Sequence, residues 1–309
     1  MRDFQHTVVL GAGVIGASWT ALFLASGRSV AVYDVSDSAE KSVREYVERA
    51  WPTLTELGLT ENGTPDAVSF HTSAAQAVEN ASFIQESVPE RLAIKHALYG
   101  EIEPALAEGA IVATSASGLT LSQMQEGWRD PARFVLGHPF NPPHLIPLVE
   151  VMGNERTDEG AVDAAERFYK TVGKVTIRVN KEVPGHVANR LQAALWREAI
   201  HLVNESVASV EDVDKAVWAG PGLRWAAMGP TMLFHLGAGQ GGLQEFCERY
   251  SASFNGWWDD LGVLHLDEGL AKTLVEGVSE EAAGQTTEEL SGKRDALLVA
   301  MLKASAQQR

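Results

Sequence analysis

The sequence contains little cysteine, no long apolar run and no cluster of positive charge. Cys247 is the only cysteine in 309 residues, which excludes an intramolecular disulfide and fits a reducing compartment. We expect it to pack as a small apolar residue on a helix. No stretch approaches transmembrane length, and the first apolar run is too short for a signal-peptide core. The net charge of −16 disfavours nucleic acid and anionic membranes as partners. We therefore expect a cytoplasmic protein that binds neither, and no residue set suggests a metal site.

The chain begins instead with a short apolar strand (residues 7–10), a glycine-rich turn, a helix and a second strand (residues 29–34). The turn has the pattern Gly-x-Gly-x-x-Gly, in which the three glycines allow a tight turn, backbone approach to a pyrophosphate, and helix–strand packing. The N–H groups at the helix start would face the phosphate charge. The alternative is a glycine-rich turn in an unrelated α/β protein. The motif predicts a dinucleotide site formed by Gly11, Gly13, Val14, Ile15 and Gly16.

An acidic residue, Asp34, ends the second strand. A carboxylate at this position can accept hydrogen bonds from the adenosine ribose and would repel a 2′-phosphate. Asp37 adds to that repulsion. The expected cofactor is therefore NAD rather than NADP.

Strand-like runs recur through the first 180 residues and mostly alternate with helical segments such as 17–26 and 39–57, as in a Rossmann-type, doubly wound parallel sheet. The last three strands should include an antiparallel pair, because the proline-rich connection 138–147 is too short for a crossover helix. From Pro184 onward we expect helices only, beginning with residues 185–207, and a marginal helix in the acidic tail from Ser279. The expected domains are 1–183, which binds NAD, and 184–309, an all-helical substrate and dimerisation domain. The expected strands are 7–10, 29–34, 83–86, 110–115, 133–137, 148–152 and 175–179.

Three sets of polar residues should meet at the carboxyl ends of the strands, where such sheets bind ligands. Ser115 and Ser117 follow one strand, and His138 ends another. Glu150 is flanked by apolar residues in the next strand, where an unpaired charge would be costly, so it needs a partner. An acid that orients an imidazole is the arrangement of a general base. The alternative is a purely structural His–Glu pair.

Asn189 is a fourth candidate, on the helix expected after Pro184. Its amide is suited to hydrogen-bonding a substrate carbonyl. Equally, asparagine near a helix start often bonds the local backbone.

Together these motifs resemble the L-3-hydroxyacyl-CoA dehydrogenase family over nearly the whole chain, less so after about residue 260. The resemblance implies a nucleotide-binding domain, a helical domain that usually mediates dimerisation, and NAD as cofactor. It implies that His138 is the catalytic base, Glu150 its orienting acid, and that Ser117 and Asn189 bind the reacting oxygen region. His186 departs from the family pattern, which usually has Phe or another apolar residue there. The matching segments are 11–16, 114–117 (Thr-Ser-Ala-Ser), 137–142 (Gly-His-Pro-Phe-Asn-Pro), 148–151 (Leu-Val-Glu-Val) and 184–191 (Pro-Gly-His-Val-Ala-Asn-Arg-Leu).

Further cofactor contacts follow from the same resemblance. Glu90 and Lys95, in Val-Pro-Glu-Arg-Leu-Ala-Ile-Lys, match the segment that lines the ribose and nicotinamide end of the cofactor. Ser115 joins this set.

Within the family, residues 50–59, 83–90 and 220–230 resemble carnitine dehydrogenases and the L-gulonate 3-dehydrogenase/lambda-crystallin group. Acyl-CoA enzymes carry a lysine-rich segment after the second strand, whereas residues 38–59 hold four acidic residues and three basic ones, only one of which is a lysine. Arg224 is suited to pair with a free carboxylate, and Trp225 to cover an aliphatic stem or a quaternary ammonium; a surface ion pair and a core tryptophan are the alternatives.

The sequence therefore predicts an NAD-dependent dehydrogenase that oxidises the 3-hydroxyl of a small, free L-3-hydroxy acid, carnitine- or gulonate-like. An L-3-hydroxyacyl-CoA dehydrogenase is the alternative enzyme. A crystallin-like structural protein or an NAD-binding regulatory protein is the alternative of another class. The roles of His186 and of the pair Trp257 and Trp258 stay open.

Overall fold

The computed structural model of the protein describes residues 4–306. The chain divides into two compact units, Met1–Ala188 (unit 1) and Asn189–Arg309 (unit 2). None of the helices in the described range is long and apolar enough to span a membrane.

Unit 1 is built on an eight-stranded sheet with the order β3-β2-β1-β4-β5-β6-β7-β8. Neighbouring strands are parallel except for β6 and β7, which are antiparallel. The expected antiparallel pair is therefore confirmed: the connection between β6 and β7 contains no helix that would return the chain across the sheet. The strands are β1 (His6–Leu10), β2 (Ser29–Tyr33), β3 (Val68–His71), β4 (Phe83–Glu86), β5 (Ile111–Thr114), β6 (Phe134–Pro139), β7 (Leu148–Met152) and β8 (Val175–Arg178).

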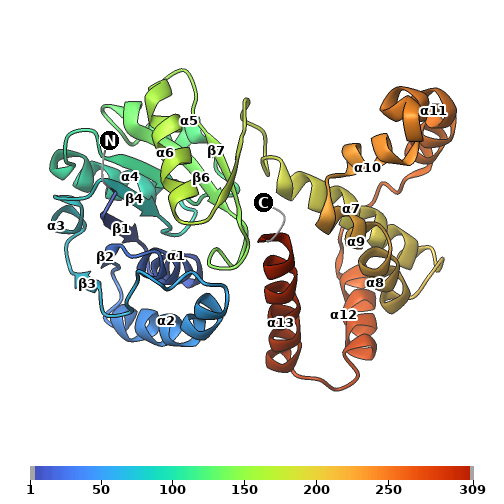
Figure 1. Ribbon diagram of the computed structural model, residues 1–309, viewed down its shortest axis with the longest axis horizontal. Coiled ribbons are helices and arrows are strands. Elements are labelled where there is room, and N and C mark those ends of the chain that lie inside the picture. The colour runs from blue at the N-terminus through green and yellow to red at the C-terminus, as the bar shows by residue number, and fades with distance from the viewer. Residues whose placement is uncertain (1–3, 307–309) are drawn as a thin grey trace. The chain divides into compact units, whose positions relative to one another are not determined.

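Helices cover both faces of this sheet (Figure 1). Alternate strand residues serve the two faces, so Val9 joins one hydrophobic core while Val8 and Leu10 join the other. Because both faces are covered, central strands such as β5 and β6 are buried along their whole length rather than at alternate positions. One core holds α1 (Val14–Ala25), α2 (Ala39–Glu56) and α6 (Glu159–Thr171); the other holds α3 (Ala74–Val78), α4 (Leu92–Ile102) and α5 (Leu121–Gln125).

Two features of unit 1 differ from the sequence-based expectation. β3 is absent from the expected strands, because this short edge strand is only half-buried and lacks a strong apolar pattern. The helix expected from residue 185 begins at Ala188 instead. Gly185 and His186 have φ angles of +75° and +49°, in the left-handed region that ends or prevents a right-handed helix.

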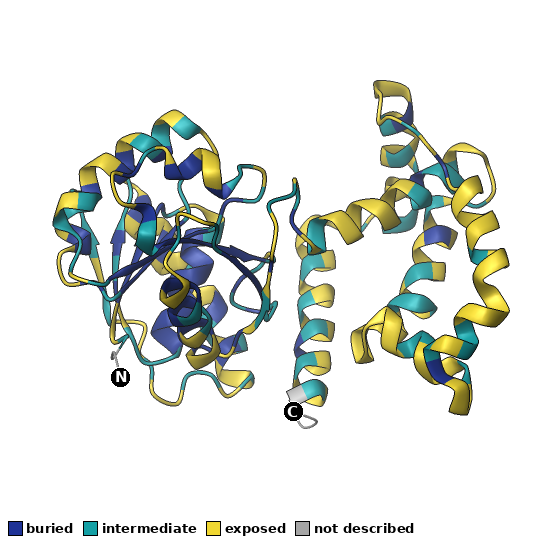
Figure 2. Ribbon diagram, turned by 90° about the horizontal axis from the view of Figure 1, so that it is seen from above, coloured by how far each residue is buried: buried dark blue, intermediate teal, exposed yellow. Residues whose placement is uncertain are grey.

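Unit 2 is all-helical, as expected, and little of it is buried within the chain (Figure 2). Cys247 lies on its exposed surface, which corrects the expectation that it packs as a small apolar residue. Trp218 is exposed as well. Trp196 is likewise exposed, at 54%, whereas Trp19 of unit 1 is fully buried. The helices are α7 (Ala188–Asn204), α8 (Val210–Ala219), α9 (Pro221–Ala227), α10 (Pro230–Gly237), α11 (Gly242–Asp260), α12 (Glu268–Ala282) and α13 (Thr287–Ala306), so the acidic tail is helical.

Candidate active site

The strand register brings the glycine-rich loop and His138 to the same edge of the sheet. Leu10 of β1 aligns with Glu86, Glu86 with Thr114, and Thr114 with Leu136 of β6. Gly11 follows this row by one residue and His138 by two. Because these strands are parallel, both lie at the carboxyl end of the sheet, the usual ligand edge of such folds.

The glycine-rich loop has the shape that a dinucleotide requires. Gly11 has φ +94°, and an added Cβ there would lie 2.7 Å from backbone atoms of Ser87. A Cβ on Gly16 would lie 1.8 Å from the Gly11 carbonyl oxygen, so neither site admits a side chain. Gly13 faces open space and caps α1 without a side-chain hydrogen bond, which leaves the N–H groups of the first turn available to an anion. The residues present therefore fit a cofactor pyrophosphate.

Asp34 follows β2 and binds this loop directly. Its Oδ2 accepts the N–H of Ala12 at 2.6 Å, and its Oδ1 accepts the N–H of Ser36 at 2.8 Å. The carboxylate thus tethers the loop to the end of β2. Its contact with a ribose stays a prediction.

His138 and Glu150 form a buried pair across the antiparallel strands. They are register partners in β6 and β7, so their side chains project from the same face. His138 Nδ1 lies 2.7 Å from Glu150 Oε2; His138 is 5% exposed and Glu150 is fully buried. A carboxylate only accepts, so Nδ1 carries the hydrogen and Nε2 of the neutral ring presents a lone pair. That is the tautomer of a base.

The other oxygen of Glu150 is held by the start of α7. Oε1 accepts the N–H groups of Val187 and Ala188, each at 2.9 Å. Burial acts to raise the pKa of Glu150, but the hydrogen bonds from His138, Ala188 and Val187 outweigh it and keep the pKa below its ordinary value. Glu150 is therefore an anion that orients the imidazole and stabilises any positive charge that the ring gains.

A buried lysine anchors the proline-rich connection between His138 and Glu150. Lys174 Nζ donates to the carbonyl oxygens of Pro143 and Ile146, the latter at 2.8 Å, and lies 5.1 Å from the ring centre of Trp19. Burial lowers its pKa to about 7. The connection is thereby fixed to the core beneath it. Sequence reasoning missed Lys174, since nothing near it in the chain marks it as buried.

Glu90 and Ser117, both expected at the site, are joined by the loop after β5. The Glu90 carboxylate accepts the N–H groups of Ser117 and Gly118, the latter at 3.1 Å. Burial acts to raise the pKa of Glu90, but these hydrogen bonds outweigh it and lower the pKa. The Ser115 hydroxyl instead lies in a network with Gln85 Nε2 at 2.8 Å and Ser87 at 2.9 Å. Their contacts with a cofactor or substrate stay predictions.

Lys95, expected beside the cofactor, is buried against Glu86. Its Nζ lies 2.7 and 2.8 Å from the two carboxylate oxygens, and the Tyr99 hydroxyl donates to the same group at 2.8 Å. Sequence reasoning missed Glu86. The signal was present, because Glu86 is an acid at the end of a buried apolar strand, as Glu150 is in β7.

The remaining expected site residues belong to unit 2. Asn189 is half-buried in the first turn of α7, next in the chain to Ala188. Arg224 and Trp225 lie on α9, exposed. Their roles toward a substrate stay predictions.

The chain matches two protein-family domains in succession. Residues 6–183 match the 3-hydroxyacyl-CoA dehydrogenase NAD binding domain, and residues 185–263 match the 3-hydroxyacyl-CoA dehydrogenase C-terminal domain.

Individual proteins resemble the whole chain. It is 45% identical to L-carnitine dehydrogenase of Streptomyces coelicolor, with 98% of this chain and 96% of that protein aligned. It is 41% identical to L-carnitine dehydrogenase of Pseudomonas putida, over 98% and 95% of the two chains. Among solved structures, 5-formyl-3-hydroxy-2-methylpyridine 4-carboxylic acid 5-dehydrogenase, an NAD+-dependent dismutase, superposes with a TM-score of 0.82 at 30% identity, covering 96% of this chain and 97% of that one. The chain therefore belongs to the 3-hydroxyacyl-CoA dehydrogenase family and is an NAD-dependent dehydrogenase acting on CH–OH.

Proposed function

We propose that this protein oxidises the 3-hydroxyl of a small, free L-3-hydroxy acid to the 3-keto acid, with L-carnitine as the first substrate to test. The observation that carries the proposal is the buried His138–Glu150 pair at the sheet edge that also holds the dinucleotide loop. Its relatives named L-carnitine dehydrogenase support the choice of substrate.

His138 is the general base in this mechanism. Its Nε2 lone pair takes the proton of the substrate hydroxyl, while Glu150 keeps Nδ1–H in place and stabilises the imidazolium that results. NAD, when bound, supplies the acceptor for the hydride that leaves carbon 3. The low exposure of both side chains keeps bulk water from competing for the proton and strengthens their attraction.

The cofactor is held by the chain's own backbone and acids. The loop of Gly11, Gly13, Val14, Ile15 and Gly16 receives the pyrophosphate at the start of α1, and Asp34 receives the adenosine ribose. Glu90, Lys95 and Ser115 shape the ribose and nicotinamide end: Glu90 by fixing the loop at Ser117 and Lys95 by neutralising Glu86.

The substrate is held at its reacting oxygen by Ser117 and Asn189 and at its carboxylate by Arg224. A guanidinium pairs with a carboxylate through two parallel hydrogen bonds. Trp225 covers the quaternary ammonium or aliphatic stem with its ring face.

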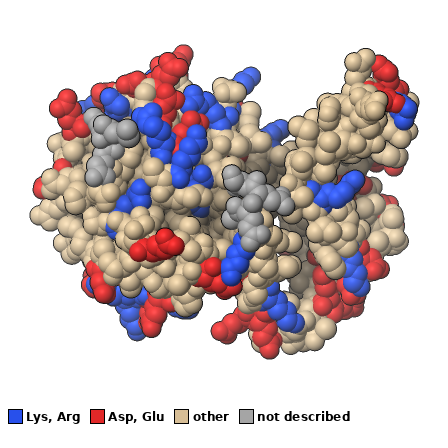
Figure 3. Space-filling model, in the orientation of Figure 1, with Lys and Arg blue, Asp and Glu red and all other residues tan. Residues whose placement is uncertain are grey.

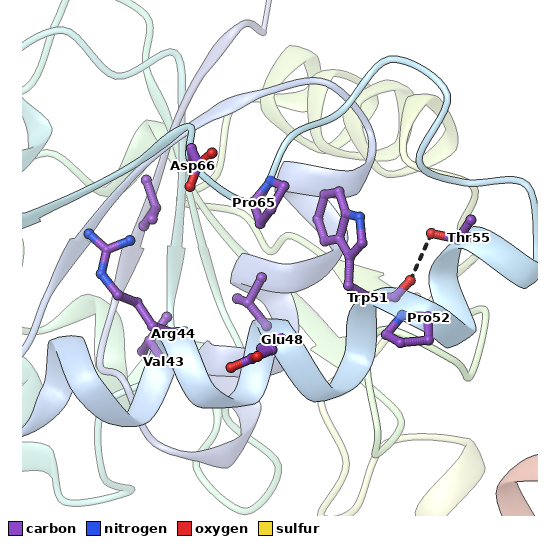
Figure 4. A pocket seen from close by; sticks show the side chains of 10 residues that line it. Val43, Arg44, Glu48, Trp51, Pro52, Thr55, Pro65 and Asp66 are labelled. Atoms are coloured by element: carbon purple, nitrogen blue, oxygen red, sulfur yellow. Dashed lines mark hydrogen bonds between the residues drawn. The ribbon is translucent and has the colours of Figure 1, made fainter.

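The charges on the surface of α2 favour a free acid over a CoA ester as the substrate. A groove of about 690 Å³ runs along this helix (Figure 4), where Arg44 is accompanied by Glu48 and Asp66. Arg44 is already paired with Glu40, at 2.8 Å. Figure 3 shows Lys and Arg side chains of unit 1 interspersed with Asp and Glu on the face in view. Such a surface is poorly suited to the phosphates of coenzyme A.

We further propose a homodimer formed through unit 2. Large apolar side chains are exposed on this unit, more than a monomer usually leaves in water. Light scattering should give the mass of two chains, and Trp218→Glu should lower it, whereas Val35→Glu on unit 1 should not. A wild-type mass of one chain contradicts the dimer. The exposed side chains include Leu191, Trp196, Trp218, Leu223, Trp257 and Trp258.

We also propose a cytoplasmic location, because a single cysteine cannot form an intramolecular disulfide, which fits a reducing compartment. Fractionation of the source cells, with activity assayed in each fraction, tests it. Activity confined to a membrane or secreted fraction contradicts it.

The enzymatic proposal is tested by following NADH formation with L-carnitine, L-gulonate, L-3-hydroxybutyrate and L-3-hydroxybutyryl-CoA. A free acid should exceed the CoA ester in kcat/KM by about a hundredfold, as expected when a site's polar groups are matched by one substrate alone. Preference for the CoA ester contradicts the substrate class but leaves the roles of His138 and Glu150 intact. NADH binding without turnover of any hydroxy acid indicates a regulatory protein.

A further inference from the structure

His186 places a second imidazole against the proposed base. The ring centres of His186 and His138 lie 5.1 Å apart, and His186 is 3% exposed. It belongs to the turn whose next two N–H groups bind Glu150. A histidine here departs from the family pattern, which usually has Phe or another apolar residue at this position, so the hydrogen bonding of its two nitrogens needs an explanation.

The two nitrogens of His186 are in different situations. Nε2 lies 3.4 Å from the carbonyl oxygen of Ala116, which only accepts, so Nε2 carries the hydrogen. Nδ1 is then a lone-pair acceptor. It is buried and has no hydrogen-bond partner among residues 4–306. Buried polar atoms are rarely left unpaired, because each costs about 1–3 kcal/mol.

The ring stays neutral beside His138. Burial lowers the pKa of His186, and repulsion from a protonated His138 lowers it further; the Ala116 carbonyl, Glu150 and Glu90 oppose these effects without cancelling them. A neutral ring keeps the Nδ1 lone pair available while His138 accepts a proton.

The backbone is also held in an unfavourable conformation to place this ring. His186 has φ +49°, in the left-handed region that non-glycine residues seldom adopt. Strain of this kind costs on the order of 1–3 kcal/mol and is concentrated at ligand sites. An apolar side chain would fill the same space without a buried unpaired atom, so packing alone does not account for histidine.

We propose that His186 is a specificity-determining residue whose Nδ1 accepts a hydrogen bond from an N–H or O–H group that the substrate carries next to its reacting carbon. The proposal rests on the function proposed above, since the substrate must bind at His138. Nδ1 of His186 would distinguish substrates within the class. It would bind a primary ammonium or hydroxyl group next to the reacting carbon, whereas a trimethylammonium group at that position has no hydrogen to donate.

A matched pair of acids tests this inference. L-Carnitine and 4-amino-3-hydroxybutyrate of the same hand share their skeleton and charges, and differ in that only the second has N–H donors. The affinities of the two acids are measured by calorimetry on the NADH-loaded enzyme, and kcat/KM is measured alongside. The variants are His186→Phe, which keeps a ring but loses the acceptor, and His186→Asn, whose amide oxygen lies near the position of Nδ1 and which tolerates a positive φ.

In His186→Phe the preference for the amino acid over carnitine should fall by about tenfold or more, the usual effect of losing a hydrogen bond to a charged group. His186→Asn should restore most of it. If the phenylalanine variant fails to fold, His186→Gly is used in its place, because glycine removes the acceptor and also relieves the backbone strain.

If His186→Phe leaves the ratio of the affinities for the two acids unchanged, the inference is wrong. That result would mean that Nδ1 binds water or nothing. Because binding is read without turnover, that result is distinct from failure of the proposed function, in which no hydroxy acid is oxidised.

Discussion

Glu150→Gln is the sharpest perturbation that the site offers, because it removes one charge and leaves the shape of the side chain. In the native protein one oxygen accepts Nδ1–H of His138, and the other accepts the N–H groups of Val187 and Ala188. Glutamine has one oxygen and one NH2 group to place in these two positions.

The two possible orientations of the new amide are unequal. With its NH2 toward the backbone, the part-buried N–H groups of Val187 and Ala188 would each lose a hydrogen bond to a charged acceptor, which is worth about 1.5–3 kcal/mol. With its oxygen toward the backbone, the NH2 faces His138 and turns Nδ1 into an acceptor. Nε2 must then carry the hydrogen, and the ring is no longer a base. The second orientation is favoured, so kcat should fall by the whole contribution of general base catalysis, about 10²–10⁴-fold.

Steady-state NADH formation measures this loss, and fluorescence titration of NADH shows whether cofactor affinity is retained. Glu166→Gln is the matched control, since Glu166 also lies in unit 1 but pairs with Arg178 at the surface. We expect kcat of the control to stay near that of the native enzyme. A Glu150→Gln enzyme with near-native kcat would refute the role of the pair.

Three further predictions follow from the same geometry. His138→Ala should lower kcat by about 10²–10⁴-fold with little change in NADH affinity; native turnover would exclude His138 as the base. Asp34→Ala frees the N–H of Ala12, so KM for NAD should rise about tenfold and discrimination against NADP should relax, both read from kinetics with the two cofactors. Lys174 has a folded pKa of about 7, below the ordinary value of 10.5, so the unfolded chain binds more protons between these values and native stability should rise with pH across this window. Urea unfolding at pH 7 and 9 should show that rise in the native protein relative to Lys174→Met, and equal pH dependence would contradict the assignment.

The sequence alone determined the layered architecture of unit 1, apart from its edge strand β3, and the pairing of His138 with Glu150. Apolar runs separated by helical segments specify a parallel sheet, because each run is too short for a helix and must be covered on both faces. The glycine pattern depends on local backbone geometry, which the chain carries wherever it folds. His138 and Glu150 followed from one energetic condition, that a charge in an apolar strand needs a partner, together with a connection too short for any arrangement but an antiparallel one.

Only the tertiary structure decided what surrounds that pair. The N–H groups of Val187 and Ala188 reach Glu150 because the backbone at Gly185 and His186 is left-handed. For the same reason the helix begins at Ala188 and not at residue 185, where the sequence predicted it. Lys174 meets the proline-rich connection through contacts between residues 28 and 31 positions apart. Such contacts leave no periodic pattern in the chain, since packing of distant segments selects them. The pairing of Lys95 with Glu86 and the unpaired nitrogen of His186 have the same origin: burial, which sequence spacing does not encode, determines which polar atoms are satisfied.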